Sequence, residues 1–187
     1  MPTARRSRTI AAPVEEVWSL VRDPHHLPRW WPRVTRVEDV QDGAFTEVML
    51  TRKGKVVRAD FNVVATDEHT RALTWAQRIQ GTPFARLLSS AETEVRLAAV
   101  PPEAPDAPDG PDGPDAPDAA ALARARARGR VANAAEVNAA EVSATEVTIE
   151  LRQTLTGLFP RLGGVMVRRA AAATIDEALD GLERISV

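Results

Sequence analysis

The stretch RTIAAPVEEVWSLVRDP, residues 8–24, passes from a strand pattern to a helix pattern within a few residues. The alternation over Arg5 to Ile10 predicts a short first strand. Ala12-Pro13 then opens a helix, since proline is favoured at the first helical position, and Glu15 and Glu16 follow where the helix dipole favours anions. Asp23-Pro24 ends this helix, and its apolar face is formed by Val14, Val17, Trp18 and Val21.

The sequence after this helix predicts one more short helix, then strands, then one long helix. The short helix covers about Pro24 to Trp30, and Pro32 stops it. Strands are predicted over Arg33–Val40, Ala44–Arg52, Lys55–Thr66, Arg71–Ile79, Ser90–Val100 and Glu146–Gly157, with a short helical turn at Phe84–Leu88 and a long helix over about Leu162–Ile185. An antiparallel sheet of this length should curl, with the long helix in its concave side, which is an α+β fold.

One segment, Pro101 to Ala144, differs in composition from the rest of the chain. It holds seven of the fourteen prolines and no aromatic residue, isoleucine or methionine. Such a segment cannot bury enough apolar surface to offset the entropy of ordering it, so we expect a disordered Pro/Asp/Ala-rich insertion in the hairpin between the last two strands. Its four arginines, which alternate with alanine and glycine, leave two interpretations open: a solvated tether, or an element that binds a protein partner.

Composition and charge exclude several classes of protein. The formal net charge is -2, which gives no attraction to nucleic acid or to a membrane surface, and no segment is apolar enough to span a bilayer. The chain has no cysteine, which suits a reducing cytosol, and no apolar run of signal-peptide length follows its basic start. We therefore expect one cytoplasmic domain over residues 1–187.

Side-chain sizes predict a cavity between the sheet and the long helix. The first half of that helix is nearly all alanine, where larger residues would be needed to fill the space to native density. Gln77 and Gln153 stand on otherwise apolar strand faces, as the polar groups of a small-molecule site do. The predicted lining is Trp18, Trp30, Phe61, Trp75, Gln77, Phe84, Leu97, Leu151, Gln153, Phe159, Met166, Ala170 and Ala173. The alternative is that the alanines pack backbone to backbone and the glutamines lie at the rim.

The stretch DPHHLPRWWP, residues 23–32, first suggests a histidine site. A metal site needs three or four suitably placed ligands, and the chain has only three histidines, so we expect no metal. Neither a nucleophile-elbow motif nor a phosphate loop is present, and we expect no cofactor. The weak acid/base candidates are His26, Asp60 and Arg169. We expect the stretch to form a corner over the cavity, with Trp30 facing inward and Trp31 against the outer rim.

Three stretches carry a resemblance to a known family. RTIAAPVEEVWSLVRDPHHLPRWWPRV, RALTWAQRIQGTPFARLLSSAETEVRL and LFPRLGGVMVRRAAAATIDEALDGLERI resemble the polyketide cyclase/dehydrase and lipid-transport group of the SRPBCC, or START-like helix-grip, superfamily. The most recognisable pattern is I-x-A-P-x-x-x-V-W at residues 10–18. The resemblance implies a curved seven-stranded antiparallel sheet that grips a C-terminal helix, with a ligand cavity between them. It implies no fixed catalytic set.

These observations leave three functional hypotheses. The leading one is a binding protein for a small hydrophobic ligand, lipid-like or polyketide-like. The second is a cyclase, aromatase or dehydratase that acts on a polyketide-like substrate in the same cavity, which requires ionisable groups pointing into it. The third is a protein-interaction module with a vestigial cavity, in which the insertion or the sheet surface binds the partner.

Overall fold

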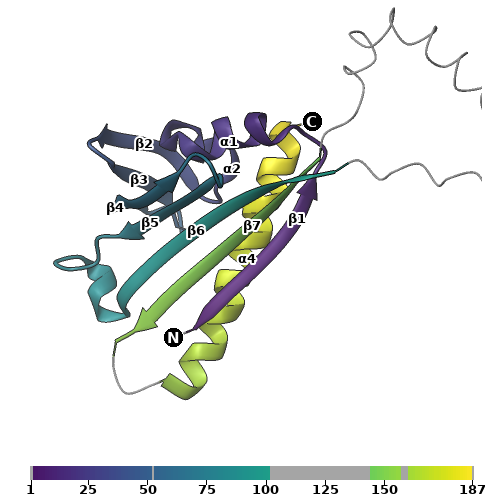
Figure 1. Cartoon of the computed structure of the whole chain (residues 1–187). Helices are drawn as coiled ribbons and strands as arrows, with labels where there is room; N and C mark the ends of the chain where they lie inside the picture. The colour runs from purple at the N-terminus through teal and green to yellow at the C-terminus, as the bar shows by residue number, and fades with distance from the viewer. Residues whose placement is uncertain (1, 52, 102–143, 157–159, 187) are drawn as a thin grey trace, which may run out of the picture. The chain divides into compact units, whose positions relative to one another are not determined.

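The structure, a computed structural model, describes residues 2–51, 53–101, 144–156 and 160–186 (Figure 1). Within these residues one antiparallel sheet of seven strands has the order β1-β7-β6-β5-β4-β3-β2. Its strands are β1 (Thr3–Ile10), β2 (Val34–Gln41), β3 (Ala44–Leu50), β4 (Val56–Asp67), β5 (Ala72–Gln77), β6 (Leu88–Val100) and β7 (Ala144–Leu155). The helical segments are α1 (Val14–Arg22), η1 (Pro24–His26), α2 (Leu27–Trp30), η2 (Pro83–Arg86) and α4 (Pro160–Ser186).

This architecture confirms the predicted α+β helix-grip fold. Strands β2 to β7 follow one another as antiparallel neighbours, and β1 adds to the free edge of β7. Helix α4 runs along one face of β6, β7 and β1, and α1 lies near its C-terminal end (Figure 1). A sheet needs cover on its apolar face, and here one long helix and the short helices after β1 provide it.

The first hairpin shows how a local signal fixes the register. Asp42 and Gly43 both have positive φ, 50° and 74°, and Gln41 pairs with Ala44 across them. Two such residues in succession form the hairpin turn whose twist matches that of the strands it joins. The Asp42-Gly43 turn therefore places Phe45, Glu47 and Met49 on one face of β3.

The segment predicted as one helix over Pro24–Trp30 is divided in two. The carboxylate of Asp23 accepts a hydrogen bond from the backbone N–H of His25 at 2.9 Å, which supports the 3₁₀ turn η1. Pro28 begins a new turn, and the N–H of Trp31 donates to the carbonyl of Leu27 at 2.7 Å, which closes α2. Two prolines four residues apart remove two backbone donors, so one continuous helix does not form.

The main core lies under the C-terminal half of α4. The predicted apolar stripe is buried there: Ile175, Leu179 and Leu182 are at most 1% exposed, as is the flanking Ala178. They pack in one cluster with side chains from α1 and from the sheet, including Val17, Val95 and Ile149. This end of the helix therefore anchors the fold and leaves its N-terminal half free to form a site.

The predicted insertion, Pro101 to Ala144, lies outside the described residues except at its two ends. At those ends Val100 pairs directly with Ala144, so β6 and β7 form the two sides of one hairpin.

Candidate functional site

A cavity of about 410 Å³ lies between the sheet and the N-terminal half of α4. Strands β3 to β7 supply most of its wall, and α4, η2 and the residue after α2 supply the rest. The lining consists of Trp31, Glu47, Met49, Phe61, Trp75, Gln77, Phe84, Leu87, Leu88, Ala91, Thr93, Leu151, Gln153, Leu155, Val167, Ala170, Ala171 and Thr174. A hollow of this size with mainly apolar walls and a few polar groups is the usual form of a small-molecule site.

Strand register explains why the two glutamines meet in this cavity. Phe61 of β4 pairs with Gln77 of β5, and Ala91 of β6 pairs with Gln153 of β7. Because residues two apart on a strand share a face, Gln77 lies on the face of Trp75, and Gln153 on that of Leu151. The structure therefore brings the two predicted amides to one apolar wall.

Small side chains on α4 leave the space open. The helix faces the cavity with Val167, Ala170, Ala171 and Thr174, one face at helical spacing. The hydroxyl of Thr174 donates to the carbonyl of Ala170 at 3.1 Å, so it is already satisfied within the helix. None of the four carries a side chain long enough to fill the hollow beside the aromatic residues of the sheet.

The structure differs from the prediction at the two adjacent tryptophans. Trp31 lines the cavity, and its ring meets that of Trp75 edge to face, with 5.7 Å between centroids. Trp30 is 2% exposed in the core beside Trp31, and its backbone lies against Gly181 of α4. The close approach of α2 to α4 fixes the rotation of α2 about its own axis. The backbone of Trp30 lies next to α4, and its side chain is not part of the cavity wall.

Glu47 is the ionisable residue of this site, and the sequence analysis missed it. It is 1% exposed, lines the cavity from β3, and its Oε1 has no hydrogen-bond partner among the described residues. Burial raises the pKa of the Glu47 carboxyl to about 8. The signal that could have found it is the alternation of Phe45, Glu47 and Met49, which puts a carboxyl between two apolar residues on an inward face.

The predicted lining residues fall into four groups. Seven line the cavity: Phe61, Trp75, Gln77, Phe84, Leu151, Gln153 and Ala170. Trp18 and Leu97 are buried in the main core like Trp30, because α1 covers that end of β6. Met166 and Ala173 are exposed on α4, since their helical positions turn them away from the sheet. Phe159 lies outside the described residues.

The three acid/base candidates do not line the cavity. Asp60 accepts a hydrogen bond from the hydroxyl of Thr46 at 2.8 Å on the opposite face of the sheet. His26 belongs to η1, and Arg169 is exposed on α4. Glu47 is thus the single ionisable side chain among the described residues of the cavity wall.

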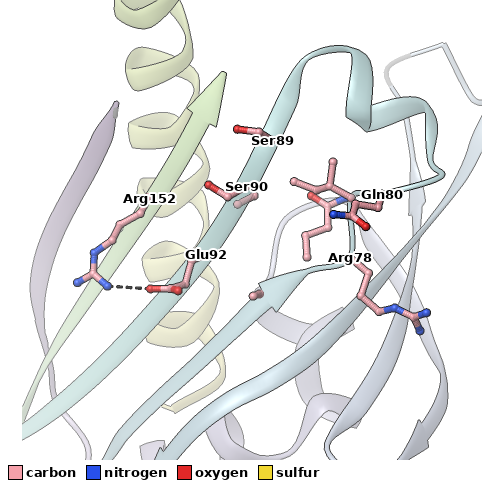
Figure 2. Close-up of a pocket in the computed structure, with 10 residues that line it drawn as sticks. Arg78, Gln80, Ser89, Ser90, Glu92 and Arg152 are labelled. Carbon is pink, nitrogen blue, oxygen red and sulfur yellow. Dashed lines mark hydrogen bonds and ion pairs between the residues drawn. The ribbon is translucent and has the colours of Figure 1, made fainter. Parts of the chain in front are cut away.

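A second hollow, of about 570 Å³, lies on the other face of the sheet where β5 and β6 diverge (Figure 2). Arg78 and Gln80 reach it from the connection after β5, and Ser90 and Glu92 from β6 (Figure 2). Arg152 donates to Glu92 across it at 2.9 Å and also to Glu94 and Glu150. Arg152 and Glu92 in its wall already form an ion pair with each other, and the other groups labelled in Figure 2 are polar, so the apolar cavity is the better candidate for a ligand site.

The described residues contain neither a cluster of metal ligands nor a helix that could span a membrane. No group of three or more histidine, aspartate or glutamate side chains in these residues is placed to hold a metal ion. None of the helices in the described part is both long and apolar enough to cross a membrane.

Comparison with known proteins agrees with this architecture. Residues 1–103 match the sequence model of the family described as polyketide cyclase / dehydrase and lipid transport. The chain belongs to this family. The family resemblance predicted from the I-x-A-P-x-x-x-V-W pattern is therefore confirmed. The match includes Glu47 and Trp75 but ends before β7 and α4, which complete the cavity.

Solved structures of the polyketide cyclase and START superfamily share the fold. The chain is 16% identical to the di-domain ARO/CYC BexL of the BE-7585A biosynthetic pathway, with a TM-score of 0.64 over 98% of this chain and 46% of that one. It is 12% identical to the ZhuI aromatase/cyclase from Streptomyces sp. R1128, with a TM-score of 0.63 over 98% and 92%. A START superfamily protein from Mycobacterium smegmatis is 15% identical, with a TM-score of 0.61 over 98% and 96%.

These identities establish the fold and not the ligand. The chain spans just under half the length of BexL and most of the length of the two single-domain proteins. No curated protein matches the sequence.

Proposed function

We propose that this protein binds a small hydrophobic ligand in the cavity between the sheet and α4. The observation that carries the proposal is the cavity of about 410 Å³, whose wall is mainly aromatic and aliphatic. Burying an apolar ligand there removes its surface from water, which is the main driving force for such binding. The few polar groups, chiefly Glu47 and the amides of Gln77 and Gln153, would orient the ligand. Family membership supports a lipid-like or polyketide-like compound.

A cyclase, aromatase or dehydratase that uses the same cavity is the second candidate. It requires an ionisable group in the cavity, and Glu47 meets this requirement. A carboxyl that keeps its proton near neutral pH can act as a general acid toward a bound carbonyl. An enzyme assay with a polyketide-like substrate would separate this candidate from simple binding, since only an enzyme turns the ligand over.

Filling the cavity from α4 should abolish ligand retention. Ala170 lines the cavity, whereas Ala173, three residues further along the same helix and likewise exposed, does not. We expect Ala170→Phe to weaken binding of an apolar probe at least tenfold, because its ring would occupy the space that the probe needs. The measurement is equilibrium titration of 2-ethylnaphthalene, followed by nuclear magnetic resonance.

The matched control is Ala173→Phe, which adds the same ring to the same helix outside the cavity. It should leave the affinity within about twofold of wild type. Equal weakening by both substitutions, or none by either, would contradict the proposed site.

Replacing segment 101–143 by Asn-Gly tests the third hypothesis, a protein-interaction module. Because Val100 and Ala144 already pair, a two-residue turn can join them. We expect the free energy of unfolding to rise by about 1 kcal/mol or more, since a shorter loop costs less entropy to close, and probe affinity to stay unchanged. Urea denaturation measures the free energy of unfolding, and titration with the probe measures the affinity. A shortened protein that binds the probe but loses its cellular function would support the interaction module instead.

A further inference from the structure

Glu47 is a buried acid with no counter-charge among the residues that the structure describes. Its cross-strand neighbours are Val37 on β2 and Ala59 on β4, and Phe45 and Met49 flank it on its own strand. From α4, the residues that line the cavity are Val167, Ala170, Ala171 and Thr174, none of them charged. The charged residues Arg58 and Asp60 belong to the other face of β4, because side chains alternate along a strand. No described group near Glu47 is placed to neutralise a carboxylate.

Glu94 shows what this fold does with a glutamate that stays charged. It is 8% exposed, and Arg152 and Arg96 both donate to its carboxylate, the former at 2.6 Å. Burial alone would raise the pKa of Glu94, but these hydrogen bonds outweigh burial and leave its pKa below the ordinary value. In the described part of the chain neither an arginine nor a backbone N–H donates to Glu47, and burial raises its pKa instead of lowering it. The uncharged form of Glu47 is therefore the one that its surroundings favour.

An uncharged carboxyl offers an O–H donor in the cavity wall. The amide groups of Gln77 and Gln153 and the hydroxyl of Thr93 add further donors to the same wall. A neutral ligand oxygen that accepts a hydrogen bond matches this set, and it brings no charge into an apolar cavity. A ligand carboxylate lacks a cation to pair with there, and an ammonium group would first require Glu47 to lose its proton.

We propose that Glu47, as an uncharged hydrogen-bond donor, selects apolar ligands that carry a neutral carbonyl-type oxygen and rejects their carboxylate counterparts. This rests on the proposed function, because it names the ligand class of the same cavity. Glu47 is the specificity-determining residue, and the apolar wall supplies affinity common to all ligands. Selection follows the protonation state of Glu47, so it weakens when the pH rises past the pKa of about 8.

Four naphthalene probes of nearly equal size test this proposal: 2-acetylnaphthalene, 2-ethylnaphthalene, 2-naphthoate and 1-(2-naphthyl)ethylamine. Each is titrated into wild type, Glu47→Gln and Glu47→Leu at about pH 6 and about pH 9.5, on either side of the Glu47 pKa. Circular dichroism verifies that each protein is folded at each pH. Glutamine keeps a donor and cannot ionise, whereas leucine has no donor, so the two variants separate hydrogen bonding from charge.

The quantity compared is the affinity for the ketone relative to the ethyl compound, within each protein. At about pH 6 we expect this ratio to fall about tenfold from wild type to Glu47→Leu, the size of one buried hydrogen bond, and to be largely kept in Glu47→Gln. At about pH 9.5 it should fall in wild type and stay constant in Glu47→Gln. Binding of 2-naphthoate should be the weakest in wild type at both pH values.

Three results would overturn the proposal. If the ratio of affinities is the same in wild type and Glu47→Leu, Glu47 makes no hydrogen bond to the ketone. If the ratio in wild type does not change with pH, the selection does not depend on the protonation state of Glu47. Tighter binding of the amine than of the ketone at about pH 6, where the proposal has Glu47 uncharged, shows that Glu47 acts as an anion. In each case 2-ethylnaphthalene still reports on the proposed function: if it binds and Ala170→Phe abolishes that binding, apolar ligand binding stands while the role of Glu47 falls.

Discussion

Gly181→Ala is expected to lower the free energy of unfolding by about 3 kcal/mol, because the added methyl group has no room. A Cβ built on Gly181 would lie 2.8 Å from the Cα of Trp30 and 2.9 Å from its carbonyl carbon. These are backbone atoms, so no side-chain rotation relieves the overlap, and α2 and α4 must move apart. Urea denaturation followed by circular dichroism measures the loss.

Gly164→Ala is the matched control in the same helix. A Cβ on Gly164 would meet nothing within 4 Å, and alanine is a better helix former than glycine by about 1 kcal/mol. The control should therefore be neutral or stabilising, opposite in sign to Gly181→Ala. Two substitutions with equal effects would mean that helix propensity and not close packing decides the result.

The contact at Gly181 also bears on the ligand site. Trp30 and Trp31 are adjacent, so movement of the Trp30 backbone shifts the ring of Trp31, which lies 5.7 Å from that of Trp75. If Gly181→Ala folds at all, we expect it to weaken probe binding as well. A distant helix contact therefore holds the cavity wall in place.

The order of elements could be predicted from the sequence because each signal was local. Asp42-Gly43 specifies a tight hairpin, and the apolar spacing of Ile175, Leu179 and Leu182 specifies one buried helix face. Both patterns depend on residues within a few positions of one another. The division of Pro24–Trp30 into η1 and α2 was not predicted, since it depends on which backbone groups Asp23 and Leu27 bond.

The cavity was predictable only in part, for a physical reason. The alternation of Trp75 with Gln77, and of Leu151 with Gln153, identified inward faces, and register brought the two glutamines together. The choice between Trp30 and Trp31 depends instead on the rotation of α2 against α4, which no local pattern encodes. Glu47 was missed because a glutamate in a strand is usually on the solvent face, and its alternation with Phe45 and Met49 was not weighed against that expectation.

Glu47→Gln is expected to stabilise the protein, by an amount that grows with pH. In the unfolded chain Glu47 loses its proton near its ordinary pKa of 4.5, whereas the folded protein holds it up to a pKa of about 8. Between these values the unfolded state binds fewer protons than the folded state, so wild-type stability falls as pH rises, by roughly 1 kcal/mol per pH unit. Glutamine does not ionise in this pH range, so Glu47→Gln does not lose stability in this way as the pH rises. The variant should match wild type near pH 4.5 and exceed it by roughly 4 kcal/mol at pH 8.

Glu94→Gln is the control for this prediction, since it makes the same chemical change at a paired glutamate. Removing the charge of Glu94 leaves Arg152 and Arg96 with one partner fewer, so this variant should be less stable than wild type at neutral pH. Urea denaturation of wild type, Glu47→Gln and Glu94→Gln from about pH 5 to about pH 9 gives the free energy of unfolding of each protein as a function of pH. A stability difference between wild type and Glu47→Gln that does not change with pH would show that Glu47 is ionised in the folded protein. A buried glutamate whose pKa is raised lowers the stability of the folded protein as the pH rises, and here it lies in the wall of the candidate ligand cavity, where perturbed pKa values are typical of functional groups.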